Sequence, residues 1–231
     1  MQHSQFNRQF TLSAHILPWA LLIFFLLSSL LAPDTMLTYL AKDEEGGLVE
    51  NLTVLFLLPG IAAGLYGFFA CRRNIRPWYA AWWLLMWTLA CIYFAGEEVS
   101  WGQWYFQWET PESIARINDQ GETNLHNTST WFDQKPRTLV ELWIFATGLV
   151  WPILRWLRKA APYASNSWQY WLHPVNALVS AALFFTLVRF AGWAGVFELR
   201  ELFGSSELRE MCVALFLSLY LISFPLRACK D

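Results

Sequence analysis

Long apolar runs, separated by shorter polar stretches, dominate the pattern of this chain. Six of them have the length of a membrane-crossing helix, which needs about 20 predominantly apolar residues. We therefore expect spans at residues 15–32, 49–70, 77–96, 138–157, 171–197 and 211–226. The pattern predicts an all-α polytopic membrane helix bundle, formed by residues 1–231 as a single integral membrane domain.

The first apolar run admits two interpretations, a cleaved signal peptide or a membrane span. It is long for a signal peptide, and no clear Ala-x-Ala cleavage site follows it. We therefore expect an uncleaved first helix.

The one long polar stretch, residues 97–137, follows the third run. If the third helix continued through it, Glu97, Ser100 and Trp101 would share one face with later tryptophans. Thr110-Pro111-Glu112 is a typical helix start, and Gly121 suits a left-handed helix cap. We expect an interfacial helix or a re-entrant loop here, because tryptophan favours the membrane–water interface.

Charge is segregated along the chain and predicts its orientation. Basic residues cluster after the second and fourth runs and at both termini, whereas the loops after the first, third and fifth runs are acidic. Cytoplasmic loops carry the excess of Lys and Arg. Both termini are therefore expected in the cytoplasm and residues 96–127 outside it, on the periplasmic side of a bacterial inner (cell) membrane.

Composition supports a membrane protein and argues against a nucleic-acid partner. The chain is 56% hydrophobic and only 15% charged, against about 25% charged in a soluble domain. Its net charge of −2 gives no basic surface for nucleic acid. The four cysteines lack metal-ligand spacing, and we expect free thiols and no disulfide framework; they are Cys71, Cys91, Cys212 and Cys229.

Several glutamates fall at the predicted outer ends of different spans. Because these ends share one membrane face, the side chains are expected to converge on one shallow cavity; they are Glu50, Glu97, Glu98, Glu141 and Glu210. Ionisable groups near hydrocarbon are costly and usually mark function. An acid-rich extracytoplasmic site is therefore the main functional prediction.

The adjacent pair Glu97-Glu98 is the most informative part of this site. Neighbouring residues point about 100° apart on a helix, so we expect the two carboxylates to have different roles. One is predicted to act as a base or metal ligand and the other to orient a partner. The alternative is an interfacial acid pair that merely faces water.

His126 is the only histidine predicted in the outer loops, and we expect a base or metal ligand there. The alternative is an ordinary polar surface residue. With Glu97 and Glu98 it completes the predicted catalytic set and a tentative site for a divalent cation, since hard cations prefer carboxylate oxygens.

A wider set of residues is predicted to bind substrate. Ser100 lacks the Gly-x-Ser-x-Gly setting of a nucleophile and is included for binding only. Arg189, inside the fifth span, is expected to face a carboxylate such as Glu141 or Glu210, or an anionic headgroup. The set is Glu50, Ser100, Trp101, Gln103, Glu122, Asn124, Asn127 and Arg189.

Two resemblances bear on this site. The runs Gly-Glu-Glu-Val-Ser-Trp-Gly-Gln at 96–103 and Gly-Glu-Thr-Asn-Leu-His-Asn at 121–127 resemble a pattern that recurs among uncharacterised bacterial inner-membrane proteins. That resemblance implies a multi-pass membrane protein and brings no activity. The glutamate pair also resembles that of intramembrane CAAX-type glutamate proteases, but Gly102 stands where those enzymes have arginine. Their membrane histidine motifs are matched only by a misspaced His173-Pro-Val-Asn176.

Two functions are compatible with these features. The first is a hydrolase or transferase that acts on a lipid or lipid-linked substrate at the outer face. The second is a non-catalytic protein that binds or transports a lipid, or that assists an envelope protein partner. Convergence of the carboxylates in one polar pocket would favour the enzyme.

Overall fold

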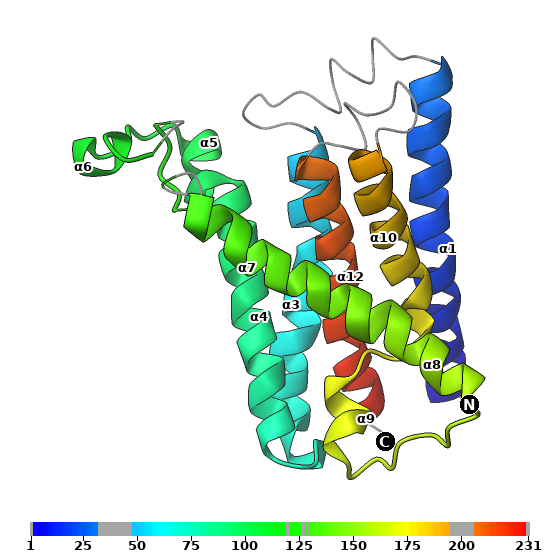
Figure 1. Ribbon diagram of the computed structural model, residues 1–231. Helices are drawn as coiled ribbons and strands as arrows, with labels where there is room; N and C mark the ends of the chain where they lie inside the picture. Colours follow the sequence, from blue (N-terminus) through cyan, green and yellow to red (C-terminus); the bar gives the residue numbers. More distant parts are fainter. Residues whose placement is uncertain are drawn as a thin grey trace.

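The computed structural model describes residues 2–31, 48–118, 121–125, 128, 130–194 and 206–229. Within these ranges the chain is all-helical and contains no strand. Figure 1 shows the long helices as a bundle with both termini at one end and the short helices α5 and α6 at the other. The long helices are α1 (Gln2–Leu31), α3 (Leu48–Cys71), α4 (Tyr79–Glu98), α7 (Thr130–Trp143) with its continuations η4 (Ile144–Val150) and α8 (Trp151–Leu157), α10 (Val179–Ala194) and α12 (Ser206–Ala228).

Shorter turns of helix connect these elements. They are η1 (Arg72–Asn74), η2 (Ser100–Gly102), α5 (Gln103–Phe106), α6 (Glu112–Ala115), α9 (Trp168–Leu172) and η5 (Asn176–Leu178). The turns η2, α5 and α6 lie in the polar segment after the third span, so this segment contains helix, as expected, in short pieces.

Six helical segments of the described chain are long and apolar enough to cross a membrane, as the hydrophobic pattern predicts. Their bounds differ from the predicted ones by a few residues at most ends; they are Asn7–Leu31, Leu48–Asn74, Tyr79–Glu98, Lys135–Leu157, Trp168–Ala191 and Glu207–Ala228. The largest difference is at the N-terminus, where α1 already begins at Gln2. The described chain therefore has the architecture of a multi-pass membrane protein.

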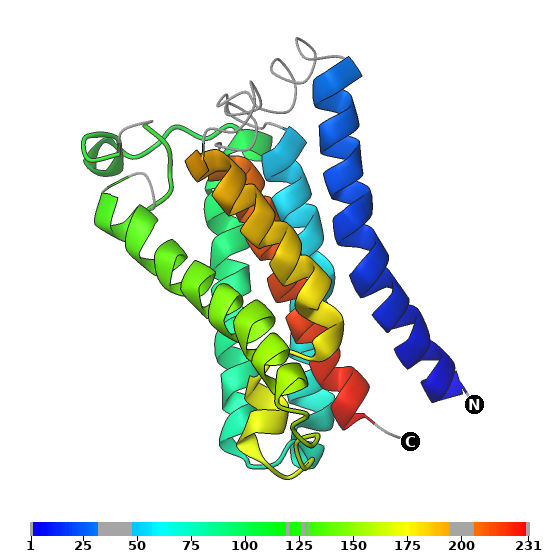
Figure 2. The same cartoon turned by 45° about the vertical axis from the view of Figure 1, so that its right-hand side comes forward.

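Helix α12 forms the centre of the bundle and packs against α3, α4 and α10 (Figure 2). Its aromatic residues Phe216, Tyr220 and Phe224 are fully buried. The Tyr220 hydroxyl accepts a hydrogen bond from Trp83 Nε1 (2.8 Å) and donates one to the carbonyl of Leu172 (2.9 Å). Buried aromatic hydroxyls need such partners, so Tyr220 joins three segments at the core.

Glycines on α3 allow this close packing. A Cβ atom at Gly60 would lie 2.5 Å from the Ser218 Cα of α12, and one at Gly64 would lie 2.2 Å from the Thr88 hydroxyl of α4. Small residues spaced four apart let membrane helices approach closely. Gly60 and Gly64 therefore allow α3 to pack closely against both α12 and α4.

The fifth predicted span is interrupted near its start. Helix α9 ends at Leu172, and the chain is extended at His173 and Val175 before it re-enters helix at η5 and α10. Proline disfavours helical backbone at the residue before it, and Pro174 follows His173 directly. The predicted span at 171–197 therefore corresponds to a segment able to cross a membrane whose helix is interrupted near its start, and residues 195–197 lie outside the described residues.

The expectation that the four cysteines are free thiols was wrong for one pair. Cys71 and Cys229 form a disulfide, with their Cα atoms 5.5 Å apart, whereas Cys91 and Cys212 are buried free thiols. The partners lie 158 residues apart in sequence, and only the packing of α3 on α12 brings them together. Sequence spacing carried no sign of this contact.

Charged residues occupy opposite ends of the bundle. Helices α3 and α12 begin, and α4 ends, at the end that carries the glutamates Glu50, Glu98, Glu207 and Glu210, which we call the acidic end. The other, basic end holds Arg72, Arg155 and Arg227. The charge rule predicts that the basic end faces the cytoplasm, whereas disulfides persist mainly in oxidising compartments. The two indications disagree, and the side of the membrane on which each end lies stays a prediction.

Candidate functional site

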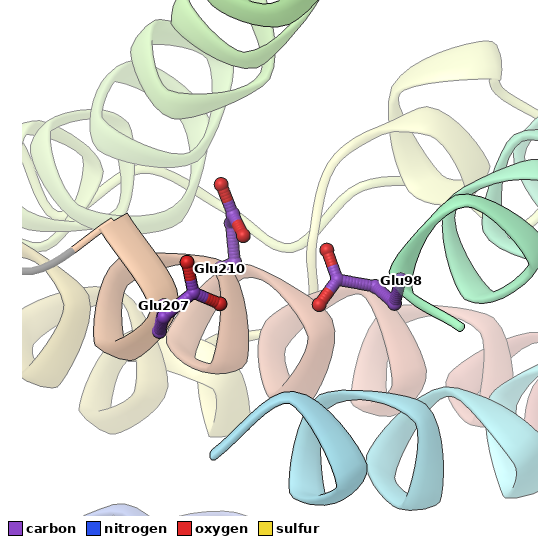
Figure 3. A group of neighbouring side chains, drawn as sticks. All are labelled: Glu98, Glu207 and Glu210. Atoms are coloured by element: carbon purple, nitrogen blue, oxygen red, sulfur yellow. The ribbon is translucent and has the colours of Figure 1, made fainter. Parts of the chain in front are cut away.

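Glu97 and Glu98 form the last turn of α4 and diverge there. The Glu97 carboxylate accepts hydrogen bonds from Trp101 Nε1 and from the backbone N–H of Leu125, both at 2.7 Å. Glu98 points instead across to α12 (Figure 3). The two side chains thus have different surroundings: Glu97 binds the polar loop and Glu98 faces a group of carboxylates.

That group consists of Glu98, Glu207 and Glu210; one carboxylate oxygen of each lies within 4.8 Å of one oxygen of the other two. Glu207 and Glu210 are three residues apart on the first turns of α12, so they project to the same side. Glu50 of α3 also acts on Glu98 through its charge. Four carboxylates from three helices thus converge at the acidic end.

Glu98 is the most enclosed member of this group. It is only 8% exposed, and its side chain shares a hydrogen bond with that of Glu210. The charges that act on it most are those of Glu210, Glu207 and Glu50. Like charges in a poorly solvated site repel strongly, so a cation among these carboxylates would relieve that repulsion.

Arg137 of α7 is a cation beside this group, and Arg209 of α12 also interacts with the charge of Glu210. The Arg137 guanidinium forms an ion pair with Glu210, and both side chains are largely buried. The pair joins the start of α7 to the start of α12. It also places a positive charge next to the carboxylates, where it can offset negative charge on a bound molecule.

These side chains lie at one end of a cavity of about 430 Å³ between α4, α7 and α12. Its polar residues are Glu97, Glu98, Arg137 and Glu210, and its remaining wall is mainly apolar and aromatic. The volume lies in the usual range of small-molecule sites. The lining is completed by Trp87, Ala90, Tyr93, Phe94, Pro136, Val140, Val213 and Leu217.

The polar residues of the loop after α4 bind chiefly to one another. Ser100 donates to Glu122 (2.6 Å), and the Asn124 amide donates to both Glu122 (2.5 Å) and Ser100 (3.1 Å). Asn118 donates to the Asn124 side chain (2.7 Å) and accepts from the Glu122 N–H (3.1 Å). All four side chains are buried, so this network holds the loop together.

Gln103 adds a second set of loop contacts. Its amide donates to the Thr110 hydroxyl (2.8 Å), and its carbonyl oxygen accepts from the Thr123 N–H (2.7 Å). The Tyr105 hydroxyl donates to Asn51 of α3 (3.0 Å). These contacts bind α5 to residues 110–123 and to the neighbouring span.

The backbone reverses sharply directly after Glu98. Ser100, Trp101 and Gly102 all have left-handed φ values, of 44°, 55° and 98°, and such angles cost free energy at non-glycine residues. A Cβ at Gly96 would lie 2.8 Å from the Trp101 ring, so the glycine makes room for that ring against α4. The third helix ends at Glu98, so the condition for one shared helical face beyond it is not met, while Gly121 adopts the expected left-handed φ of 70°.

The other predicted site residues lie apart from the cavity lining. Arg189 pairs with Glu141 at 3.3 Å, one of the two carboxylate partners expected for it. Glu141 also lies 3.8 Å from Arg209 and does not join the carboxylate group. His126 and Asn127 lie outside the described residues. Of the two predicted metal ligands that the structure describes, Glu98 belongs to the group of three carboxylates and Glu97 does not.

Sequence reasoning missed two residues of this site, Glu207 and Arg137. The Glu-x-x-Glu spacing of Glu207 and Glu210 was a readable signal, since residues three apart share a helix face. For Arg137 no sequence signal exists, because only the crossing of α7 over the bundle brings it to Glu210. No protein-family model, curated protein or solved structure matches this chain.

Proposed function

We propose that this protein binds an amphiphilic, lipid-like molecule in the cavity between α4, α7 and α12 and performs acid–base chemistry on its polar head. The observation that carries the proposal is one cavity with a mainly apolar wall and a polar end made of Glu97, Glu98, Arg137 and Glu210. An acyl chain would contact Trp87, Phe94 and Leu217, and the head would meet the carboxylates. We place this end outside the cytoplasm, from the distribution of charge.

The reaction class supported best is hydrolysis or group transfer. Glu98 would accept a proton from water or from an acceptor hydroxyl as its oxygen attacks an ester or phosphoester of the head. Arg137 would stabilise the negative charge that develops on that centre. The leaving alcohol would then receive a proton from the carboxylates, so the proton balance closes within the site.

Filling the cavity tests the binding part of the proposal. Ala90 lines the cavity and is exposed, so Ala90→Trp is expected to obstruct it without disturbing the core. We expect the lipid that co-purifies with the protein, measured by mass spectrometry of the extracted sample, to fall about tenfold, which corresponds to about 1.4 kcal/mol.

Leu89→Trp is the matched control, because Leu89 is a neighbouring exposed residue of α4 that does not line the cavity. It should retain the wild-type lipid content. Equal lipid content in the Ala90→Trp and Leu89→Trp proteins would contradict the proposal. Lipid bound at the cavity but never converted would support the alternative, a non-catalytic lipid-binding or transport protein.

The carboxylate group also supports a divalent cation as a cofactor. Glu98, Glu207 and Glu210 provide oxygens of the type that hard cations prefer. A bound cation would relieve the repulsion between these carboxylates and stabilise the folded protein. At a hundredfold excess over its dissociation constant, Mn²⁺ is expected to raise the thermal midpoint by roughly 5–10 °C.

Glu207→Gln should abolish most of this shift in a thermal-unfolding measurement. Glu109→Gln, in the exposed part of the loop, should leave it unchanged. If Mn²⁺ raised the thermal midpoint equally in the wild type, Glu207→Gln and Glu109→Gln proteins, the cation would bind at another site. Because Glu207 does not line the cavity, this outcome would leave the lipid-binding proposal standing.

A further inference from the structure

The basic end of the bundle contains a second polar hollow, remote from the acidic end. A cavity of about 210 Å³ lies between α8, the segment around α9 and the end of α12, and its lining includes Arg155, Tyr163, His173 and Arg227. A wider hollow of about 600 Å³ shares Arg155 with it and adds Lys159. Cations from α8 and α12 therefore line the smaller cavity, and Arg155 and Lys159 line the wider hollow beside it.

The two arginines of this cavity have no carboxylate partner within the described chain. Arg155 donates to the carbonyl of Ala161 and lies over the Tyr163 ring, 3.8 Å from its centroid. Arg227 donates to Ser223 and to the carbonyl of Tyr170. A guanidinium has five N–H donors, and these contacts use three of those on Arg227. Both groups retain donors and an uncompensated positive charge.

His173 supplies an unsatisfied polar atom in the same cavity. Its Nδ1 is buried and has no hydrogen-bond partner, although its ring lies 5.4–5.8 Å, centroid to centroid, from Trp151, Tyr163 and Trp168. Buried polar atoms in folded proteins are nearly always hydrogen-bonded. The orphaned nitrogen therefore points to a ligand with hydrogen-bonding groups.

We propose that this hollow binds the phosphate headgroup of an anionic phospholipid. Arginine binds phosphate oxygens through paired N–H donors, and basic pockets at the ends of membrane helices bind anionic headgroups. Tryptophan and tyrosine gather at the membrane–water interface, and Trp151, Tyr163 and Trp168 mark that level here. The acyl chains would then run along the exposed side of α8, where Trp156 and Leu157 lie. This site is independent of the function proposed for the acidic end.

Native mass spectrometry of the full-length protein, titrated with phosphatidylglycerol or phosphatidylcholine, tests this inference. We expect one tightly held phosphatidylglycerol and a clear preference over phosphatidylcholine. Arg155→Gln should weaken phosphatidylglycerol binding about fivefold, since one basic residue near a membrane surface contributes about 1 kcal/mol, which that factor represents. Arg158→Gln is the matched control, because Arg158 is exposed at the same helix end and lines neither hollow.

His173→Phe provides a second variant, since it keeps an aromatic ring among the same neighbours and removes the ring nitrogens. It should also weaken phosphatidylglycerol binding while the protein elutes as the wild type does. Equal losses in Arg155→Gln and Arg158→Gln, or equal binding of the two lipids, would overturn the proposal. Displacement of the lipid by millimolar inorganic phosphate would overturn it too, because the site would then bind a free anion.

Discussion

Glu98→Gln is expected to lower conversion of the bound lipid by a factor of roughly 100 to 10,000, the usual contribution of a general acid or base. Glutamine keeps the size of the side chain and removes its ability to accept and return a proton. Since Glu98 is enclosed among other carboxylates, removal of its charge should leave the fold intact. Lipid turnover by protein in nanodiscs, followed by mass spectrometry, measures the change.

Two controls distinguish a loss of catalysis in the Glu98→Gln protein from a loss of lipid binding or of the fold. Glu109→Gln changes an exposed carboxylate of the same loop and should retain full turnover. Lipid should still co-purify with the Glu98→Gln protein, because the apolar wall of the cavity is unchanged. Wild-type turnover in the Glu98→Gln protein would remove Glu98 from the reaction.

Gly60→Leu is expected to disrupt the packing of α3 on α12. Even the first atom of the new side chain would lie 2.5 Å from the Ser218 Cα, and a backbone atom cannot move aside without shifting the whole helix. Overpacking of this kind costs about 3 kcal/mol, which corresponds to a fall of roughly 10 °C in the thermal midpoint. Size-exclusion chromatography of heated samples measures that fall.

The control for this substitution is Ala62→Leu, which adds a side chain at an exposed position of the same helix. It should elute and unfold like the wild type. A Gly60→Leu protein as stable as Ala62→Leu would mean that α3 and α12 are not packed as closely as described.

The sequence predicted the membrane architecture well because hydrophobic run length reports it directly. Each of the six runs corresponds to a helical segment able to cross a membrane. The break before Pro174 lies within an apolar run, so run length alone did not predict it. The Cys71–Cys229 disulfide depends on contacts between distant segments, which no local pattern records.

The part of the candidate site that depends on local sequence patterns could also be predicted. Helical periodicity predicted that Glu97 and Glu98 point in different directions. Their positions at span ends on one membrane face predicted that Glu98 and Glu210 lie close together. Arg137 reaches the site only through the path of α7 across the bundle. That path depends on side-chain packing along the whole helix, so spacing alone could not find it.

The loop residues show a different limit of sequence reasoning. Ser100, Glu122 and Asn124 were predicted to bind substrate, because polar groups near a membrane usually have a functional role. In the structure their hydrogen bonds go mainly to one another. A dense polar motif signals a constrained structure as readily as a binding site, and the substrate-binding role of these three residues stays a prediction.

The most direct test of the central claim is a lipid inventory of the wild-type protein in nanodiscs made from a bacterial lipid extract. Mass spectrometry before and after incubation would record every lipid class. We predict that one class loses or exchanges its head group, and that Ala90→Trp and Glu98→Gln each suppress this change. An unchanged inventory, with no lipid retained by the purified protein, would contradict the account.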